Sequence, residues 1–248
     1  MFLRRGAAAL LLAFASRGCV VYEYEHELWL RADGSGSVSV TGRPALWTAF
    51  KGLGTPDDKS LGKPDDPAGG ATPEAARALF ERSGLRVRRA DVTRRDGRPY
   101  LFVSADFADV NRLAGSPAFP DLELSFGREG DRLKLWGAWK RPATAPDIGA
   151  RDREGLMAVR FHLPSKIYDH RNAAEAVERG NILSWRQDVD AALAGHALLF
   201  GATMDSRSIL GSTVKLFAWA IAGALGLLAG AILLAVRKGK RSAAPRRA

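Results

Sequence analysis

The chain has 248 residues, a formal net charge of +10 and a single cysteine. One cysteine excludes a framework of intramolecular disulfides. The charge excess lies at the two ends, in residues 1–19 and 215–248, while all 27 acidic residues lie between them and are balanced there by basic ones. This distribution removes the main support for nucleic-acid binding by the folded part of the chain.

Residues 1–18 have the pattern of an export signal peptide. Two arginines precede the apolar stretch 6–15, which is too short to span a bilayer. Two processing sites compete. A signal peptidase would cut after Ala15, whereas Gly18 followed by Cys19 resembles a bacterial lipoprotein cleavage site. Cys19 is therefore a lipidation candidate, and the sequence leaves both alternatives open.

Strict alternation of apolar and acidic residues predicts a strand over residues 22–30. One face holds Tyr22, Tyr24, Leu28 and Leu30, and the other holds Glu23, Glu25 and Glu27. We expect the acidic side to be a solvated sheet face. The turn residues 33–36 follow, and Val38 and Val40 resume the alternation, so the sequence predicts a β-hairpin.

Two helices and a long loop are predicted next. After Pro44 the large apolar residues recur at helical spacing up to Leu53. Residues 54–71 are rich in Pro, Gly and Asp and predict a mobile loop. Thr72 then has the character of an N-cap, Pro73 stands at the first helical position, and a glycine at position 84 ends the helix.

Strands dominate the rest of the domain. They are predicted over residues 85–93, 100–107, 122–126, 133–139, 157–163, 181–187 and 197–204. A helical turn is predicted near residues 110–113 and a short helix over residues 171–179. Because hairpins join several consecutive strands, we expect an α+β fold with a predominantly antiparallel sheet, seven to ten strands and two or three helices.

The end of the chain predicts a membrane anchor. Residues 216–236 contain no charge, and a helix of that length spans about 30 Å, the thickness of a hydrocarbon core. Only basic charges follow it, which favours a cytoplasmic tail. We therefore divide the chain into an export signal (1–18), an extracytoplasmic domain (19–213), a transmembrane helix (214–236) and a basic cytoplasmic tail (237–248).

No motif for catalysis or metal binding is recognisable. The four histidines have no partners at zinc-ligand spacing, and no nucleophile elbow or phosphate-binding loop occurs. We expect His26 to lie on a strand face and His162 to face solvent. The sequence thus predicts no catalytic residue, no metal site, no cofactor and no enzymatic activity.

Two tryptophans of the segment 133–139 are expected to point in opposite directions. Trp139 shares a face with Leu133 and Leu135 and should be buried, whereas Trp136 shares its face with Lys134. An exposed aromatic side chain beside basic ones suits a membrane interface or an amphiphilic ligand. Core or interface packing is the competing interpretation.

Taken together, these pieces resemble the LppM-domain lipoproteins of bacteria. The resemblance rests on the segments Gly18-Cys19-Val20, 22–40, 180–185 and 216–241. It implies an export signal ending at a cysteine, an α+β ectodomain, a C-terminal span and a role in contacting envelope lipids or glycolipids. It marks no binding residues in this chain, so the ligand-binding residues are unknown.

The function expected from the sequence is therefore a membrane-anchored extracytoplasmic binding domain. Its expected partners are the bilayer and an envelope lipid or glycolipid, without nucleic acid. The alternative is a protein-interaction or accessory subunit of an envelope complex. Neither hypothesis includes catalysis.

Overall fold

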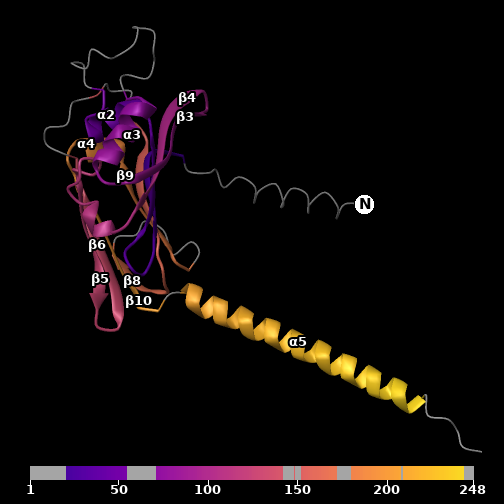
Figure 1. Ribbon diagram of the computed structural model, residues 1–248. Helices are drawn as coiled ribbons and strands as arrows, with labels where there is room; N and C mark the ends of the chain where they lie inside the picture. Colours follow the sequence, from indigo (N-terminus) through magenta and orange to yellow (C-terminus); the bar gives the residue numbers. More distant parts are fainter. Residues whose placement is uncertain are drawn as a thin grey trace, which may run out of the picture.

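The part of the chain that the structure describes forms two β-sheets, three short α-helices, one 3₁₀-helix and one long C-terminal helix (Figure 1). The computed structural model describes residues 21–54, 71–141, 148, 152–171, 180–207 and 209–242. The export signal, Cys19 and most of the predicted loop 54–71 lie outside these residues. So do residues 172–179 of the helix predicted over 171–179.

The larger sheet has six strands in the order β3-β4-β2-β1-β7-β9. Their bounds are β1 Tyr22–Leu30, β2 Gly36–Gly42, β3 Arg86–Arg95, β4 Arg98–Phe107, β7 Leu156–His162 and β9 Ile182–Asp188. The predicted hairpin of β1 and β2 is confirmed, with Gly34 at φ 84° in its turn, a conformation that glycine adopts without strain. Every pairing in this sheet is antiparallel except that of β1 with β7.

The smaller sheet is antiparallel and has the order β5-β6-β10-β8. Its strands are β5 Leu122–Glu129, β6 Arg132–Trp139, β8 Ile167–Arg171 and β10 Leu198–Asp205. The helical prediction at Arg171 is wrong, because this residue ends β8 and pairs with Gly201. The short edge strand β8 and the helix α4, Val189–Leu193, were not predicted from the sequence.

Helices α2, Pro44–Lys51, and α3, Pro73–Arg82, begin as the sequence predicts. Proline stands at the start of each, and the Thr72 side chain accepts a hydrogen bond from the Ala75 amide. The predicted helical turn is the 3₁₀-helix η1, Val110–Arg112. The Trp47 indole of α2 donates a hydrogen bond to the Leu101 carbonyl of β4, which fixes α2 on the larger sheet.

One continuous hydrophobic core lies between the two sheets and beneath α2 and α3. Aromatic rings of the two sheets meet there, as in the contacts of Phe200 with Phe161 and Trp185. Trp139 is buried, as predicted, and Trp136 lies on the opposite face of β6, where it is exposed. The alternation of β1 therefore has a clear consequence: one of its faces points into this core and the other forms part of the outer face of the larger sheet.

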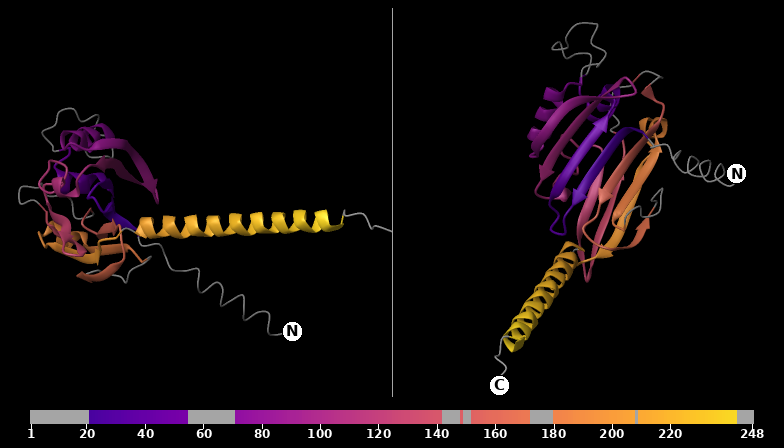
Figure 2. Two further views of the ribbon diagram at one scale, coloured as in Figure 1. Left: turned by 60° about the horizontal axis from the view of Figure 1, so that its bottom comes forward. Right: turned by 90° about the vertical axis from the view of Figure 1, so that its right-hand side faces the viewer.

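The last helix, α5, runs over Ile209–Ser242 and extends away from the domain (Figures 1 and 2). Its segment Val214–Leu233 is long and apolar enough to cross a membrane and is not buried in the domain. The α+β fold class with one apolar C-terminal helix is thus confirmed. Both figures place the start of α5 at the same end of the domain as the turn between β1 and β2.

Candidate functional site

A groove crosses the outer face of the six-stranded sheet, over β1, β2 and β4. We call it the serine groove; it is lined by Ser37, Ser39, Ser104, Trp29, Phe102, Glu27, Arg31 and Arg88, together with Val38 and Ala105. Its volume is about 550 Å³, within the range of sites that hold small molecules. This groove is the most spacious of the sites described below.

The floor of the serine groove follows from strand register. Ser39 lies opposite Glu27 of β1 and Ser104 of β4, and Ser37 lies opposite Trp29. These side chains share a face because side chains alternate along each strand while Val38 and Val40 point into the core. Ser39 is only 8% exposed, so bulkier neighbours stand around a floor of hydroxyl groups.

Trp29 forms a wall of the groove and is held in place from behind. Its indole stacks on the His162 ring, with centroids 4.8 Å apart and planes 19° from parallel. His162 Nε2 in turn lies 2.7 Å from Glu27 Oε1. A second hollow of about 280 Å³ lies on the His162 side of Trp29, so this indole, 39% exposed, stands between two depressions.

The acidic face of β1 is not the solvated surface that the sequence predicts. Arg160 lies 3.6 Å from Glu25 Oε1 and 3.7 Å from Glu27 Oε1, and the three side chains are less than a third exposed. Burial is the largest effect on Glu25 and raises its pKa, although Arg160 opposes this shift. Arg160 of the neighbouring strand β7 compensates the charge of Glu25 and Glu27, which explains why two glutamates can lie half-buried side by side on one face of β1.

Glu23 closes this network at the start of β1. Its carboxylate accepts a hydrogen bond of 2.6 Å from the Tyr100 hydroxyl and lies 2.9 Å from Arg43 Nε. Arg43 also donates to the carbonyls of Asp152 and Glu154. Burial, followed by the bond to Glu23, raises the pKa of Tyr100 to about 12. Arg43 thereby ties β1 to the segment that precedes β7.

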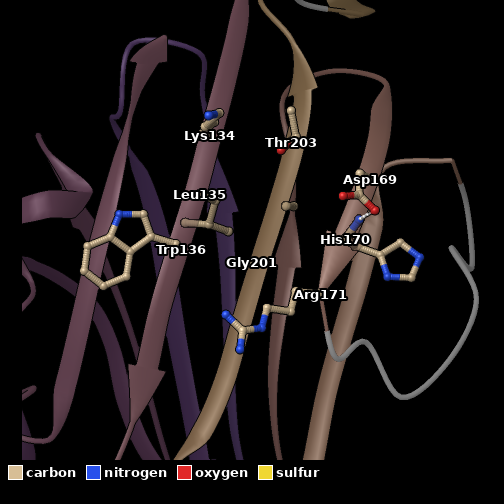
Figure 3. A pocket seen from close by; sticks show the side chains of 9 residues that line it. Lys134, Leu135, Trp136, Asp169, His170, Arg171, Gly201 and Thr203 are labelled. Carbon is tan, nitrogen blue, oxygen red and sulfur yellow. Dashed lines mark hydrogen bonds between the residues drawn. The ribbon is translucent and has the colours of Figure 1, made fainter.

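A smaller groove of about 220 Å³ lies on the outer face of the four-stranded sheet (Figure 3). Gly201 of β10 stands between Trp136 of β6 and Arg171 of β8, which are its partners in register. Figure 3 shows the Arg171 side chain lying across β10 beside Gly201, where no side chain obstructs it. Lys134 and Thr203 continue the groove, and Trp136 is 57% exposed.

A third group of polar residues is enclosed in the core. It consists of Tyr24, His26, Lys51, Asp121 and Trp139. Their buried side-chain nitrogen and oxygen atoms have no hydrogen-bond partner among the residues that the structure describes. Lys51 Nζ lies 4.0 Å from Asp121 Oδ1 and 4.3 Å and 4.8 Å from the ring centroids of Phe119 and Trp139.

Burial shifts the pKa values within this cluster in the direction of the neutral forms. The pKa of Lys51 is lowered to about 8 and that of Asp121 is raised to about 6, in both cases chiefly by burial and partly offset by the other residue of the pair. Burial, with the charge of Lys51, holds the pKa of His26 well below its usual value. The cluster is fully enclosed, so a substrate has no access to Lys51 or His26 in this conformation.

The residues singled out from the sequence thus have different outcomes. His26 does lie on a strand face, but this face points into the core, where the residue is 0% exposed. His162 is on the outward face but is held by Glu27 and Trp29. The lipidation candidate Cys19 lies outside the described residues. In the described ranges, no group of three His, Cys, Asp or Glu side chains could hold a metal ion.

The serines of the groove were missed in the sequence, although a signal was present. In the segment 36–42, Gly-Ser-Val-Ser-Val-Thr-Gly, hydroxyl residues alternate with valines, so the hydroxyls had to share the outward face. Phe102 and Ser104 gave no such signal, because their place beside β2 depends on strand order.

Comparisons with known proteins add little beyond a distant likeness. No protein-family model and no curated protein matches the chain. Among solved structures, it is similar to the folded domain of LppM from Mycobacterium tuberculosis, with 16% identity and a TM-score of 0.37. The match covers 77% of this chain and 94% of that domain. Membership of the LppM family stays a prediction at this level of similarity.

Proposed function

We propose that the protein is a membrane-anchored binding domain outside the cytoplasm, which takes the glycosylated headgroup of an envelope lipid into the serine groove. The serine groove is the observation that carries this proposal. It combines an aromatic wall, a hydroxyl floor and charged side chains of both signs in one hollow of about 550 Å³.

The chemistry of the groove matches a sugar. A sugar ring has apolar C–H faces that pack against an aromatic side chain, and its hydroxyls both donate and accept hydrogen bonds. Trp29 and Phe102 supply aromatic surface, while the three serines, Arg31, Arg88 and Glu27 supply donors and acceptors. A purely apolar lipid chain would leave these polar groups without partners.

The position of the anchor supports a ligand at the membrane. The chain passes from Asp205 at the end of β10 to Ile209 at the start of α5 within four residues, which span at most about 14 Å. The turn between β1 and β2 lies at this end of the domain (Figure 1). The basic residues after position 236 favour a cytoplasmic tail and therefore a domain on the other side of the bilayer.

We propose binding without catalysis. Lys51, His26 and Asp121, the residues of the enclosed cluster that could transfer protons, have no access to a substrate, and the outward pair of Glu27 and His162 is occupied by its own hydrogen bond. The groove itself is lined by serines without a base at hydrogen-bond distance among the contacts of the described residues.

The test uses the full chain in lipid nanodiscs that contain either a monoglycosyl diacylglycerol or the same diacylglycerol without sugar. We expect native mass spectrometry to show retention of the glycosylated lipid over the sugar-free one. Trp29→Ala should weaken that retention about tenfold, because it removes the aromatic wall.

Trp136→Ala is the matched control, since it removes another exposed tryptophan from the outer face of the other sheet. It should leave retention unchanged. Equal retention of both lipids, or equal losses in the two variants, would refute sugar binding in the groove. A protein partner captured in stoichiometric amount by crosslinking, and retained in Trp29→Ala, would favour the accessory-subunit alternative.

A further inference from the structure

The hairpin of β3 and β4 concentrates positive charge on a domain whose basic and acidic residues balance as a whole. Five arginines lie along the outward side of this hairpin, and we call them the arginine strip: Arg86, Arg88, Arg89, Arg95 and Arg98. Arg86, Arg88 and Arg89 are more than half exposed. The acids within segment 86–98 are Asp91 and Asp96, so the segment carries a clear positive excess.

A β-bulge explains why Arg86, Arg88 and Arg89 lie so close together in the arginine strip. The register of β3 against β4 shifts between Val87 and Arg89, which leaves Arg88 as an extra residue. Arg86 and Arg88 can therefore both reach the same carboxylate, that of Asp106 on β4. Arg89 pairs with Asp91 and lies over the Phe102 ring, which places it on the same outward face.

The acids already present do not saturate these arginines. Asp106 is shared by Arg86 and Arg88, and each pairing lies at the surface, where an ion pair contributes little. Arg95 forms no salt bridge with the carboxylates that the structure describes, although its charge acts on Glu25, and it lies over the Tyr100 ring, 5.0 Å from its centroid. A guanidinium group recognises a carboxylate with two parallel hydrogen bonds, so the strip has capacity for further carboxylates.

The same strand has a free edge. β3 is the terminal strand of the six-stranded sheet, and it pairs with β4 on one side only. In the part of the chain that the structure describes, residues 86–95 form no backbone hydrogen bond outside that ladder. An edge of this kind is a template for an added strand.

Protection against aggregation is the ordinary role of charge on an edge strand. The other terminal strand of this sheet, β9, has Arg186 and Asp188 as its charged residues, so two opposite charges are enough to protect that edge. The two edges of the smaller sheet, β5 and β8, also carry charges of both signs. The excess on β3 is more than protection requires.

The linear arrangement of the arginine strip fits an extended chain better than a flat membrane surface. A strand of ten residues extends about 33 Å, so the arginines form a line parallel to the strands. Arg86 lies opposite Asp106, near the end of β4, while Arg95 and Arg98 lie at the opposite end of the hairpin. A flat bilayer beside the start of α5 would touch only one end of such a line, whereas an extended chain follows all of it.

We infer that the free edge of β3 docks an extended acidic segment of a partner protein. The segment adds a strand through backbone hydrogen bonds, and its alternate carboxylates face the arginine strip as cross-strand neighbours. This inference goes beyond ligand binding in the serine groove and does not depend on it.

The probe is a fluorescent peptide of alternating Glu and Val residues, titrated onto the full chain in neutral nanodiscs. We expect it to bind, and we expect weaker binding at higher salt. The matched peptide with Gln in place of Glu should bind at least tenfold more weakly. The acidic peptide with N-methylated backbone amides should also bind at least tenfold more weakly, because it cannot extend the ladder.

Variants of the protein test whether the peptide binds at the β3–β4 hairpin. Arg95→Glu combined with Arg98→Glu reverses two charges that do not line the serine groove, and we expect about a tenfold loss of affinity. Arg128→Glu combined with Arg132→Glu makes the same change in charge on the β5–β6 hairpin and should have less than a twofold effect.

Three results would overturn the inference. Equal binding of the N-methylated peptide would mean that charge alone is recognised, without strand addition. Equal binding of the Gln peptide would remove the role of the arginines. Equal losses in the two variants would show that the peptide binds wherever the domain is positive. Because the peptide comparisons use the unaltered chain, they stand even if a variant does not fold.

Discussion

The two faces of β1 carry polar groups that differ in burial and in the partners available to them. On the inward face, Tyr24 and His26 are fully buried and have no hydrogen-bond partner among the described residues. On the outward face, Glu25 and Glu27 lie against Arg160, and Glu27 also holds His162. One strand thus separates a polar cluster without hydrogen bonds in the core from a network beside the groove that is held by ion pairs with Arg160 and by the bond between Glu27 and His162.

This difference assigns different physical roles to the two sides. A buried polar group without a partner lowers the free energy of unfolding by about 1–3 kcal/mol, and a buried charge can cost more. A half-buried network of ion pairs costs less and fixes side chains in position. We therefore expect the inner cluster to govern stability and its pH dependence, and the outer network to govern the geometry of the groove.

The largest effect should come from breaking the buried pair of Lys51 and Asp121. Asp121→Ala leaves Lys51 enclosed without its counter-ion, so it should lower the free energy of unfolding by about 3–5 kcal/mol. Lys51→Met combined with Asp121→Leu removes both charges and should be close to the unaltered protein or more stable. Denaturant unfolding followed by tryptophan fluorescence measures both; a cost below about 1 kcal/mol for Asp121→Ala would contradict the enclosed pair.

The lowered pKa of Lys51 should make the free energy of unfolding depend on pH above pH 8. Its pKa is about 8 in the folded state against 10.5 for the free side chain. Between these values the unfolded chain binds more protons than the folded one, so the free energy of unfolding rises as pH rises. From pH 8 to pH 10 the gain should be about 2 kcal/mol, at roughly 1.4 kcal/mol per pKa unit.

Lys51→Met should abolish this rise, and it provides the control. Asp121 and His26 titrate below this pH window, while burial holds the pKa of Tyr24 well above its usual value of 10. Near pH 10 the unfolded Tyr24 begins to lose its proton while the folded one keeps it, which opposes the rise, so the comparison with Lys51→Met isolates the lysine. A rise of the same size in Lys51→Met would show that another group causes it.

The contrast between the faces of β1 also explains what the sequence could predict. Alternation along β1 and β2 placed Tyr24 and Leu28 on one side and the glutamates on the other, and it predicted their hairpin. Alternation does not show which strands lie beside the hairpin. β7 pairs with β1 in parallel and brings Arg160 and His162 to the glutamates, and this pairing has no local signal.

The inner cluster was beyond prediction for a related reason. Lys51 ends α2 and Asp121 precedes β5, and only the packing of the helix between the sheets brings them together. The charged edge strand β8 was missed because a short polar sequence has little periodicity. The N-cap at Thr72 and the turn at Gly34 were predictable, since each depends on residues adjacent in the chain.

The smallest effect should come from the outer network, which Glu27→Gln weakens without changing the size of the side chain. The amide keeps the size of the side chain but loses the charge that attracts Arg160 and His162, so the free energy of unfolding should fall by about 1 kcal/mol. Lys134→Gln is the control: it breaks an exposed pair with Glu129 on the other sheet and should change stability by less than about 0.5 kcal/mol.

The mobility of Trp29 is a second measurement on Glu27→Gln, and it shows whether the outer network positions the groove wall as well as stabilising the fold. With Glu27 neutralised, His162 loses its anchor and the stacked Trp29 should become more mobile, which lowers the fluorescence anisotropy of that indole. The change is isolated by comparison with Trp29→Phe, which lacks the signal. If Glu27→Gln lowered stability by as much as Asp121→Ala while leaving Trp29 rigid, the outer network would be a structural element of the same kind as the inner cluster. The loss of rigidity at modest energetic cost is what distinguishes a network that positions a binding surface.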